Sequence, residues 1–416
     1  MGAVGDAQGR GAQRQVRDVV VVGAGLAGAG VVTALRAAAF TGRVTVVGAE
    51  GVPPYDRPPL SKELLTRADP AWLVDELGLD LAAADDVRLD EPATGLSWDG
   101  GLLAVRTAHA EVTADAVVLA TGAHAVRPPG WDGAHTLHTV ADAAALRPRL
   151  GPGTRLVIVG AGWIGAEVAS VAAAAGVRVT VVETAGSPLA TALGPAVGAL
   201  TMPWYAAAGV RLLAGAQVVR VTDEAVELSG GEVLAADTVL VAVGARPTTA
   251  WLAGTLPLAA DGSLLVDEDY RVLSGPAGLV AVGDIARRRS PRHGWVAGGH
   301  WDAALRGPES AVRALLGGQQ AADDLAPYVF STQLGHELGL YGLPGAGDDV
   351  VLRGDAAEKF TVLWFTPGTD ELTALLGVDQ PRDVAAARRL FTGVGLPHLD
   401  RTVAVDPDRP LRDAAR

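Results

Sequence analysis

Cysteine is absent from this chain of 416 residues, and its absence excludes several kinds of redox chemistry. Without thiols there can be no redox-active Cys pair, no Cys sulfenate and no Cys-bound metal centre. Disulfide reductases, thiol peroxidases and Cys-liganded clusters are therefore excluded. The eight histidines show no paired spacing typical of a metal site, so we predict no metal.

The chain also lacks a long apolar run and a basic stripe. No stretch approaches the ~20 uninterrupted apolar residues that span a bilayer, since Glu167 and Arg178 interrupt the most apolar region. The net charge is −13 and no Lys/Arg cluster stands out, so we predict neither nucleic-acid nor membrane binding. Residues 1–16 are polar and Gly-rich without a secretory pattern, and we expect a disordered leader on a soluble, cytoplasmic protein. The sequence is silent on oligomeric state.

One pattern is present twice. Residues 18–28 read DVVVVGAGLAG, and residues 155–165 read RLVIVGAGWIG. Each is a β-branched run that ends in G-x-G-x-x-G, and each is followed by an Ala-rich stretch and a second run, RVTVV. This is the βαβ unit that binds a dinucleotide at a helix N-terminus. Two units in one chain predict a protein that holds two dinucleotides against each other, as in a flavoprotein that takes hydride from a nicotinamide.

The glycines of both motifs are predicted phosphate-binding positions, because they permit the tight turn, the approach of the pyrophosphate and the packing of helix on strand. They are Gly23, Gly25 and Gly28 in the first copy and Gly160, Gly162 and Gly165 in the second.

The acidic residue that follows distinguishes the two copies. In the second copy the strand ends in Glu183, whose carboxylate can accept from both ribose hydroxyls and would repel a 2′-phosphate, which favours NADH over NADPH. In the first copy the equivalent position is Gly48. The ribose contact there is left open between the Glu50 side chain and the loop backbone around Ala49.

The order of these patterns predicts an α/β protein with two Rossmann-like dinucleotide-binding domains and a C-terminal α+β domain. We expect the NAD domain to interrupt the FAD domain, because the apolar run at 278–286 follows the whole second unit. A Pro-rich segment, Gly51–Lys62, is expected to lack regular structure. Strands are expected at 349–353 and 359–365, and a helix near 383–391. The expected boundaries are 1–16 for the leader, 17–124 and 248–325 for the FAD domain, 125–247 for the NAD domain and 326–416 for the C-terminal domain.

Together with the two glycine motifs, four short segments resemble the bacterial FAD-dependent ferredoxin reductases of the putidaredoxin reductase, rhodocoxin reductase and aromatic-ring dioxygenase reductase type. The segments are PYDRPPLSK (54–62), LATG (119–122), VGARP (243–247) and AVGD (281–284). The resemblance spans about residues 18–413. It implies FAD and NADH as cofactors and a small ferredoxin, of the 2Fe-2S kind, as partner.

The resemblance also implies roles for individual residues. Lys62 would lie near the reactive flavin ring, paired with Glu167 beside the nicotinamide, and these two are the candidate catalytic residues. Asp284 would accept a hydrogen bond from the FAD ribityl chain. Further implied contacts are Arg57, Thr121, Gly122 and Trp301 with FAD and Trp163 and Gly244 with NAD.

Several of these residues have a purely structural alternative. Lys62 has the alternative of a surface lysine at a helix start, Asp284 that of a helix cap, and Trp163 and Trp301 that of core aromatics.

The sequence also departs from the family pattern. His138 stands in place of an arginine, Gly299 and Ala303 stand in place of Glu and Asn, and FSTQ at 330–333 replaces WSDQ. The first three departures leave open how tightly FAD is held.

The predicted function is therefore hydride transfer from NADH to FAD, followed by single-electron transfer to a ferredoxin that serves a P450 or an oxygenase. Because ferredoxins are usually acidic and so is this chain, docking needs a local basic patch. Candidates are Arg382, Arg388 and Arg389, for which a solvated helix face is an equal alternative. The rival functions are an NADH oxidase or quinone/nitro reductase, and a weakly active flavoprotein-derived binding protein.

Overall fold

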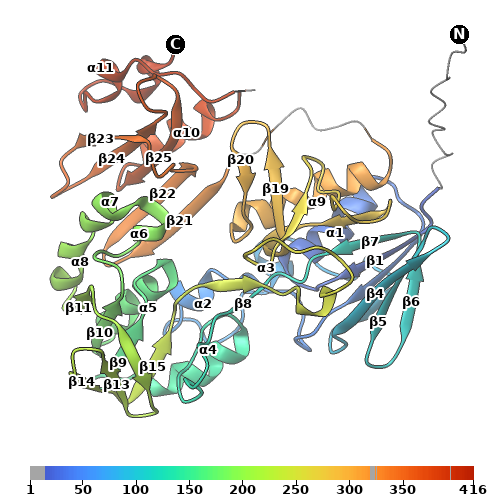
Figure 1. The fold of residues 1–416 in the computed structure, drawn as a ribbon, viewed down its shortest axis with the longest axis horizontal. Coiled ribbons are helices and arrows are strands. Elements are labelled where there is room, and N and C mark those ends of the chain that lie inside the picture. Colours follow the sequence, from blue (N-terminus) through green and yellow to red (C-terminus); the bar gives the residue numbers. More distant parts are fainter. Residues whose placement is uncertain (1–14, 319–323, 325, 394) are drawn as a thin grey trace, which may run out of the picture.

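The structure is a computed structural model that describes residues 15–318, 324, 326–393 and 395–416. The part of the expected leader that comprises residues 1–14 lies outside the described residues. Two α/β units and a C-terminal α+β unit are arranged around a common centre (Figure 1). The predicted fold class is confirmed.

The first β-branched run forms the middle of a parallel sheet. Strand β1 (Asp18–Val22) pairs with β2 (Arg43–Val47) on one side and β7 (Ala116–Leu119) on the other. Every residue of β1 after Asp18 is buried, as expected for a strand covered on both faces. The sheet order is β18-β7-β1-β2-β3, with β3 at Asp86–Arg88 and β18 at Leu279–Ala281. The chain therefore returns to this sheet after the second unit.

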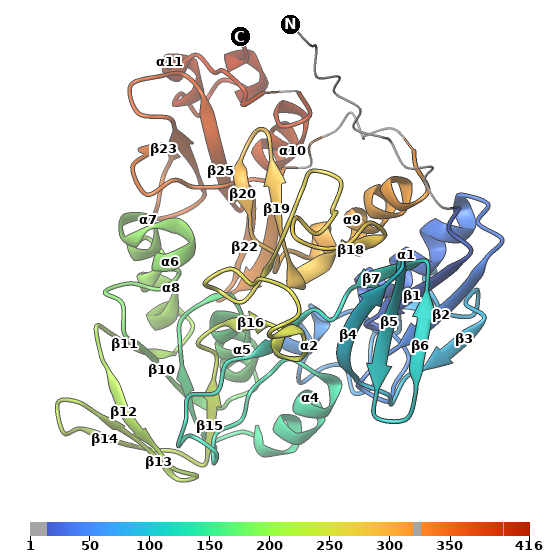
Figure 2. The same cartoon turned by 45° about the vertical axis from the view of Figure 1, so that its right-hand side comes forward.

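Two helices that are far apart in the chain lie side by side against this sheet. Helix α1 (Leu26–Ala37) follows the first glycine motif, and α9 (Trp301–Leu315) packs along it (Figure 2). Gly30 permits the close approach, because a Cβ there would lie 3.0 Å from Pro308 of α9. The N-termini of both helices border the same cavity, which is described below.

The second motif repeats this construction. Helix α5 (Trp163–Ala174) follows its glycine turn, and all neighbouring strand pairs of its sheet are parallel. The sheet order is β11-β10-β9-β15, with bounds Arg211–Ala214, Arg178–Glu183, Arg155–Val159 and Thr238–Val241.

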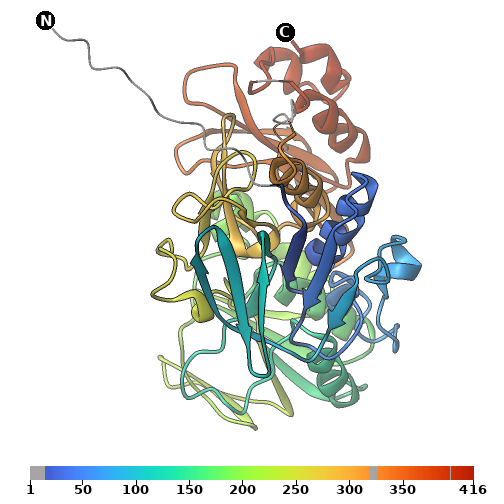
Figure 3. The ribbon, with the colours of Figure 1, turned by 90° about the vertical axis from the view of Figure 1, so that its right-hand side faces the viewer.

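Each unit also carries a three-stranded antiparallel sheet, which comes immediately before β7 in the first unit and before β15 in the second. The duplication is therefore longer than the glycine motifs alone indicate (Figure 3). The two sheets are β4 (Ala93–Asp99), β5 (Leu102–Thr107) and β6 (Glu111–Ala114), and β12 (Val218–Val221), β13 (Ala225–Leu228) and β14 (Val233–Ala235). A third small sheet contains β17 (Leu264–Val266), β19 (Ala286–Ser290) and β20 (Gly294–Val296). Strands β8 (Ala123–Ala125) and β16 (Ala245–Pro247) pair where the chain leaves the first unit and returns to it.

The C-terminal unit is a five-stranded antiparallel sheet with helix α10 (Pro381–Leu390) packed on it. The strand order is β21-β22-β25-β24-β23, with bounds Tyr328–Gln333, His336–Gly342, Leu372–Val378, Phe360–Phe365 and Asp349–Gly354. The two strands and the helix expected in this region are confirmed, with ends shifted by one or two residues. The remaining α-helices are α3 (Leu73–Glu76), α4 (Val140–Leu146), α6 (Ala190–Leu193), α7 (Pro195–Ala199), α8 (Met202–Ala207) and α11 (Arg401–Ala404).

The expectation that Gly51–Lys62 lacks regular structure is wrong for its last four residues. They form helix α2 (Pro59–Lys62), because proline at the first helical position lacks only an N–H that would have no partner there. Helix α2 packs against α5 of the second unit. The Pro-rich segment thus places Lys62 between the two nucleotide-binding units.

The statement that no basic cluster stands out is also wrong in one place, because β19 carries three consecutive arginines. Their guanidinium groups pair with carboxylates of neighbouring loops: Arg287 with Asp261 at 3.6 Å, Arg288 with Asp324 at 2.8 Å and Arg289 with Glu268 at 2.9 Å. The cluster therefore holds loops together. Within the described ranges, no helix combines the length and the apolar character needed to cross a bilayer, and no three His, Asp or Glu side chains gather as a metal site.

Candidate functional site

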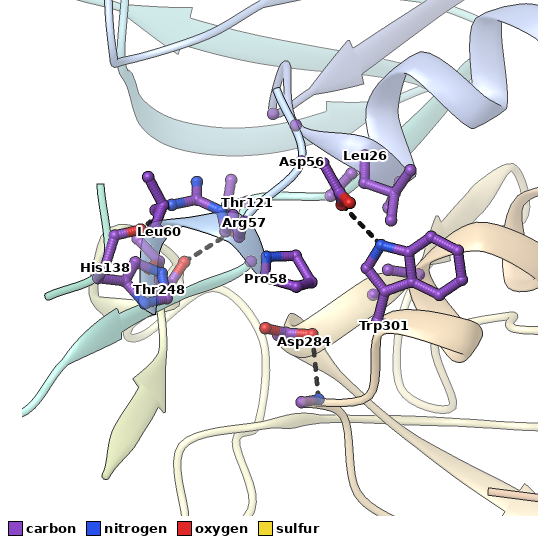
Figure 4. Close-up of a pocket in the computed structure, with 18 of the residues that line it drawn as sticks. Leu26, Asp56, Arg57, Pro58, Leu60, Thr121, His138, Thr248, Asp284 and Trp301 are labelled. Atoms are coloured by element: carbon purple, nitrogen blue, oxygen red, sulfur yellow. Dashed lines mark hydrogen bonds between the residues drawn. The ribbon is translucent and has the colours of Figure 1, made fainter. Parts of the chain in front are cut away.

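A cavity of about 450 Å³ lies at the carboxyl edge of the first parallel sheet (Figure 4). Its floor is formed by residues that follow β1, β2 and β7, and its walls come from α2, α5, α9 and β21. In open α/β sheets this edge is where ligands bind. We call this space the large cavity.

The first glycine turn, residues 23–28, forms one end of the large cavity. Gly23 has φ +118°, and a Cβ there would lie 2.1 Å from the carbonyl oxygen of Ala120. A Cβ on Gly28 would lie 1.9 Å from the oxygen of Gly23, whereas one on Gly25 would meet no protein atom within 4 Å. The outer glycines thus serve the turn and the packing, and the middle one leaves room for a ligand to approach. No side chain caps α1, so its first N–H groups are available to an anion.

The second glycine turn, residues 160–165, has the same geometry. Gly160 has φ +106°, and a Cβ there would lie 2.4 Å from the oxygen of Ala242. A Cβ on Gly165 would lie 2.1 Å from the oxygen of Gly160, and Gly162 again has open space. Helix α5 also begins without a side-chain cap. Both turns therefore have the shape that a pyrophosphate requires.

Glu183 lies beside the second glycine turn. Its carboxylate accepts hydrogen bonds from the backbone N–H of Ala161 at 2.7 Å and of Ala185 at 2.8 Å. The buried Tyr205 lies near it, and burial, together with the negative charge of Glu183, raises the pKa of Tyr205. The carboxylate at the end of β10 is thus held in a fixed orientation by the turn.

Glu50 is fixed in a different way. One of its oxygens accepts from the Tyr55 hydroxyl at 2.5 Å, and the other pairs with Arg57 at 2.5 Å. The Arg57 guanidinium also donates to the backbone oxygen of His138 (Figure 4). Burial and the neighbouring Arg57 lower the pKa of the His138 imidazole. The Arg57 guanidinium thus lies against the backbone of residue 138, where the family pattern has an arginine.

Asp284 and Trp301 also border the large cavity. Asp284 accepts from the backbone N–H of Gly299 at 3.0 Å and so fixes the segment before α9 instead of capping its own helical turn. The Trp301 indole N–H donates to Asp56 at 2.7 Å (Figure 4). Burial raises the pKa of Asp56, and this hydrogen bond opposes the shift. Trp301 lines the large cavity, as does Trp163, although Trp163 also packs against the core of the second unit.

Lys62 and Glu167 form an ion pair between α2 and α5. Glu167 is 4% exposed and also accepts hydrogen bonds from the hydroxyls of Ser61 at 2.5 Å and Ser331 at 2.6 Å. The Lys62 ammonium lies 5.2 Å from the centre of the Phe330 ring. The alternative of a solvated surface lysine is therefore wrong.

The large cavity brings most of the predicted residues together. Those that line it are Gly23, Gly25, Ala49, Glu50, Arg57, Lys62, Thr121, Gly122, Trp163, Glu167, Asp284 and Trp301. The predicted residues outside it are Gly28, Gly160, Gly162, Gly165, Glu183 and Gly244. Apart from Gly28, the latter lie in the second unit, at the glycine turn, at the end of β10 or just after β15.

Sequence reasoning missed other residues of this site, notably Tyr55, Asp56, Ser61 and Ser331. Tyr55, Asp56 and Ser61 fall within PYDRPPLSK, the segment that carries the family resemblance, so the sequence could have indicated a role for each of its polar residues. Ser331 falls within FSTQ (330–333), where it keeps the serine of the family's WSDQ.

Two family models match different parts of this chain. Residues 17–315 match the family described as pyridine nucleotide-disulphide oxidoreductase, and residues 328–415 match a reductase C-terminal domain. The chain is 31% identical over 409 residues to the benzene 1,2-dioxygenase system ferredoxin–NAD(+) reductase subunit of Pseudomonas putida, with 94% of each chain covered. It is 32% identical over 395 residues to rhodocoxin reductase of Rhodococcus erythropolis, covering 90% of this chain and 89% of that one.

Among solved structures, the covalent putidaredoxin reductase–putidaredoxin complex superimposes with a TM-score of 0.86 at 28% identity, covering 96% of this chain and 98% of that one. This chain belongs to the pyridine nucleotide-disulphide oxidoreductase family, as an FAD-dependent ferredoxin reductase. The family name refers to disulphides, but this member has no cysteine with which to exchange one. Because the chain has no cysteine, electrons that enter it cannot pass to a thiol pair of its own.

Proposed function

We propose that this chain is an NADH-dependent flavoprotein reductase that passes hydride from NADH to FAD and then single electrons to a small ferredoxin of the 2Fe-2S kind, which serves a P450 or an oxygenase. FAD supplies the conversion between a two-electron donor and one-electron acceptors. The observation that carries the proposal is the Lys62–Glu167 pair, since it joins the wall of the large cavity to the helix that begins at the second glycine turn.

The large cavity fits FAD. It is lined by a glycine turn with free helix N–H groups, by the carboxylate of Asp284 and by the ammonium of Lys62. The glycine turn would hold the pyrophosphate, Asp284 the ribityl chain, and Lys62 and Trp301 would lie at the ring. Thr121 and Gly122 would contact FAD from the end of β7. Glu50 and the backbone at Ala49 both line the large cavity and would contact the adenosine ribose.

The second glycine turn is proposed to bind NADH. Glu183, oriented by two backbone N–H groups, would accept from the ribose hydroxyls, and Gly162 would admit the pyrophosphate. Gly244, with φ +111°, would shape the turn after β15, and Trp163 would border the nicotinamide. Glu167 on the same helix would hold the Lys62 ammonium beside the two reacting rings.

Helix α10 is proposed to bind the acidic ferredoxin. Arg382, Arg388 and Arg389 are exposed. Arg388 also lowers the pKa of Tyr328, opposing the larger effect of burial, so it lies near a ring that lines the large cavity. The related putidaredoxin reductase has been seen in complex with putidaredoxin. A basic surface close to the cavity would steer an acidic partner towards it.

We further propose the domain boundaries stated above, with a FAD-binding unit at 17–124 and 248–325 and a NAD-binding unit at 125–247. Their support is the sheet order, since β18 at 279–281 extends the sheet that contains β1. We also propose a cytoplasmic location, where NADH is generated.

Purification, anaerobic titration and an acceptor assay test this proposal. The protein is expected to be yellow with bound FAD, to be bleached by NADH, and to reduce cytochrome c only when a ferredoxin is added. A colourless protein that takes up no FAD would contradict both the ferredoxin reductase and the oxidase or quinone/nitro reductase hypotheses. Bleaching by NADPH but not by NADH would contradict the role of Glu183. Turnover with oxygen or a quinone that is unaffected by ferredoxin would favour the oxidase or quinone reductase alternative.

A further inference from the structure

The Lys62–Glu167 pair has a third participant, from the C-terminal domain. Ser331 lies on β21, which packs against α5. Its hydroxyl donates to the same Glu167 oxygen that pairs with Lys62. Ser61 donates to the other oxygen. The carboxylate is thus held by donors on both oxygens, and one of these donors comes from a domain that contains neither glycine turn.

The direction of this hydrogen bond is set by a further residue of the same strand. Alternate residues of a strand point to the same face, so Ser331 and Gln333 both face inward, while Thr332 between them is exposed. The Gln333 amide N–H donates to the Ser331 oxygen at 3.2 Å. A serine hydroxyl has a single proton, and with its oxygen occupied by Gln333 that proton is directed to Glu167. Ser331 and Gln333 are 2% and 1% exposed, so no solvent competes for these bonds.

Phe330, the neighbour of Ser331 on the strand, faces the other way and lines the large cavity, where its ring lies beside the Lys62 ammonium. Two consecutive residues of β21 therefore contact the two members of one ion pair. A shift of this strand would move both contacts together.

We propose that Ser331 is a positioning residue for the reaction: through Glu167 it fixes the Lys62 ammonium at the reacting rings, so the C-terminal domain helps to build the hydride-transfer site. Ser331 touches neither cofactor in this scheme and acts only through Glu167. The inference rests on the proposed function for the role of Lys62. The hydrogen bonds themselves do not depend on it.

A matched pair of variants isolates the hydroxyl. Ser331→Thr and Ser331→Val add side chains of nearly equal shape, and only threonine can donate to Glu167. Thr332→Val serves as a control, because this neighbour on the same strand is exposed whereas Ser331 is buried. Each variant is prepared as the flavin-loaded protein, and its flavin content and thermal unfolding are recorded first.

The first measurement observes Lys62 directly. The chain contains only two lysines, Lys62 and the exposed Lys359, so protein labelled with ¹³Cε-lysine gives two signals, which Lys359→Arg assigns. In Ser331→Val we expect the Lys62 signal to move towards that of the solvated Lys359. In Ser331→Thr and Thr332→Val we expect it to stay at the wild-type position.

The second measurement is the rate of anaerobic flavin reduction by NADH, with no ferredoxin present. A hydrogen bond to a charged group contributes roughly a tenfold effect or more. We therefore expect the limiting rate of Ser331→Val to fall about tenfold below that of Ser331→Thr, with the apparent dissociation constant of NADH unchanged.

Equal rates and equal Lys62 signals in the Thr and Val variants would overturn the proposal, even if both were less stable than the wild type. The same conclusion would follow if only the dissociation constant of NADH changed. Failure of NADH to reduce the wild-type flavin would contradict the proposed function instead, and the Lys62 signal would still decide the role of Ser331.

Discussion

The preference for NADH over NADPH is the property that one carboxylate is expected to control. Glu183 is held by the N–H groups of Ala161 and Ala185, so it cannot easily turn away from a ligand at the second glycine turn. The change Glu183→Gln removes its charge and keeps its shape. It also retains only one oxygen, so one of the two backbone N–H groups loses its acceptor.

The magnitude follows from charge and distance. A 2′-phosphate on the ribose would bring a charge of about −2 to within ~4 Å of the carboxylate, where each unit pair contributes ~1 kcal/mol in water and ~4 kcal/mol at an effective dielectric constant of 20. Because Glu183 is only partly buried, we take about 2 kcal/mol in total. Its loss should raise kcat/KM for NADPH roughly 30-fold. Loss of a charged hydrogen bond to the ribose should lower kcat/KM for NADH about tenfold.

The assay compares kcat/KM for both coenzymes with ferricyanide as acceptor, so that ferredoxin docking plays no part. Glu227→Gln is the control, because this residue pairs with Arg220 in the β12–β13 hairpin and its loss changes the charge of the same unit equally. If kcat/KM for NADPH stays within twofold of the wild type in Glu183→Gln, or rises equally in Glu227→Gln, the assignment of Glu183 to the ribose is refuted.

Three further predictions concern the glycine turn, the docking surface and pH. Gly23→Ala should unfold more easily and hold little flavin, because its Cβ would lie 2.1 Å from the carbonyl oxygen of Ala120, whereas Gly25→Ala should fold normally and lose only flavin. Flavin absorbance and thermal unfolding measure the two effects, and equal stability of the two variants would contradict the prediction. Reversing charge at Arg388 and Arg389 should raise the KM for ferredoxin at least tenfold and leave ferricyanide reduction unchanged; an effect on both acceptors would contradict docking at α10. Burial, and to a lesser extent the positive charge of Arg292, lowers the pKa of His293 to about 4. The unfolded chain therefore binds this proton more tightly than the folded one, and about 2 kcal/mol of stability should be lost as pH falls from ~6.5 to ~4. Urea unfolding of His293→Phe should show a smaller loss over this range, and an equal loss in wild type and variant would contradict the prediction.

The parts of the site that the sequence predicts are those contained in short segments. Each glycine turn needs only a strand, three glycines and a helix within a dozen residues, so both could be placed before the structure was known. Lys62 and Glu167 could be paired only through the resemblance, because 105 residues separate them. Ser331 lies 164 residues from Glu167, and no local pattern links a serine in a C-terminal strand to an acid in a Rossmann helix.

The composition of a segment is misleading in two places, helix α2 and strand β19. In both, the surrounding residues determine the structure. Prolines predict irregular structure, yet Pro59 begins a helix in the one position that tolerates it. Residues 287–289 are three consecutive arginines in an acidic chain, and in the structure each of them pairs with a different carboxylate from a neighbouring loop. Neither outcome follows from counting residue types, because both depend on partners that are distant in the chain.

The two glycine turns differ in whether a carboxylate stands at the end of the second strand of the unit, and this difference has a steric origin. At position 48, which corresponds to Glu183, a Cβ would lie 2.8 Å from the Cβ of Ala24 in the first glycine turn and 3.4 Å from the oxygen of Leu89. The first unit therefore cannot carry an acid at this position without moving its own phosphate-binding turn. The nearest carboxylate comes two residues later, at Glu50, where Tyr55 and Arg57 of the Pro-rich segment engage both oxygens. In the second unit the carboxylate fits beside Ala161 and accepts its N–H. In one unit the same motif thus yields a turn whose N–H group orients a carboxylate. In the other unit the carboxylate is engaged by the Pro-rich segment that also carries Lys62.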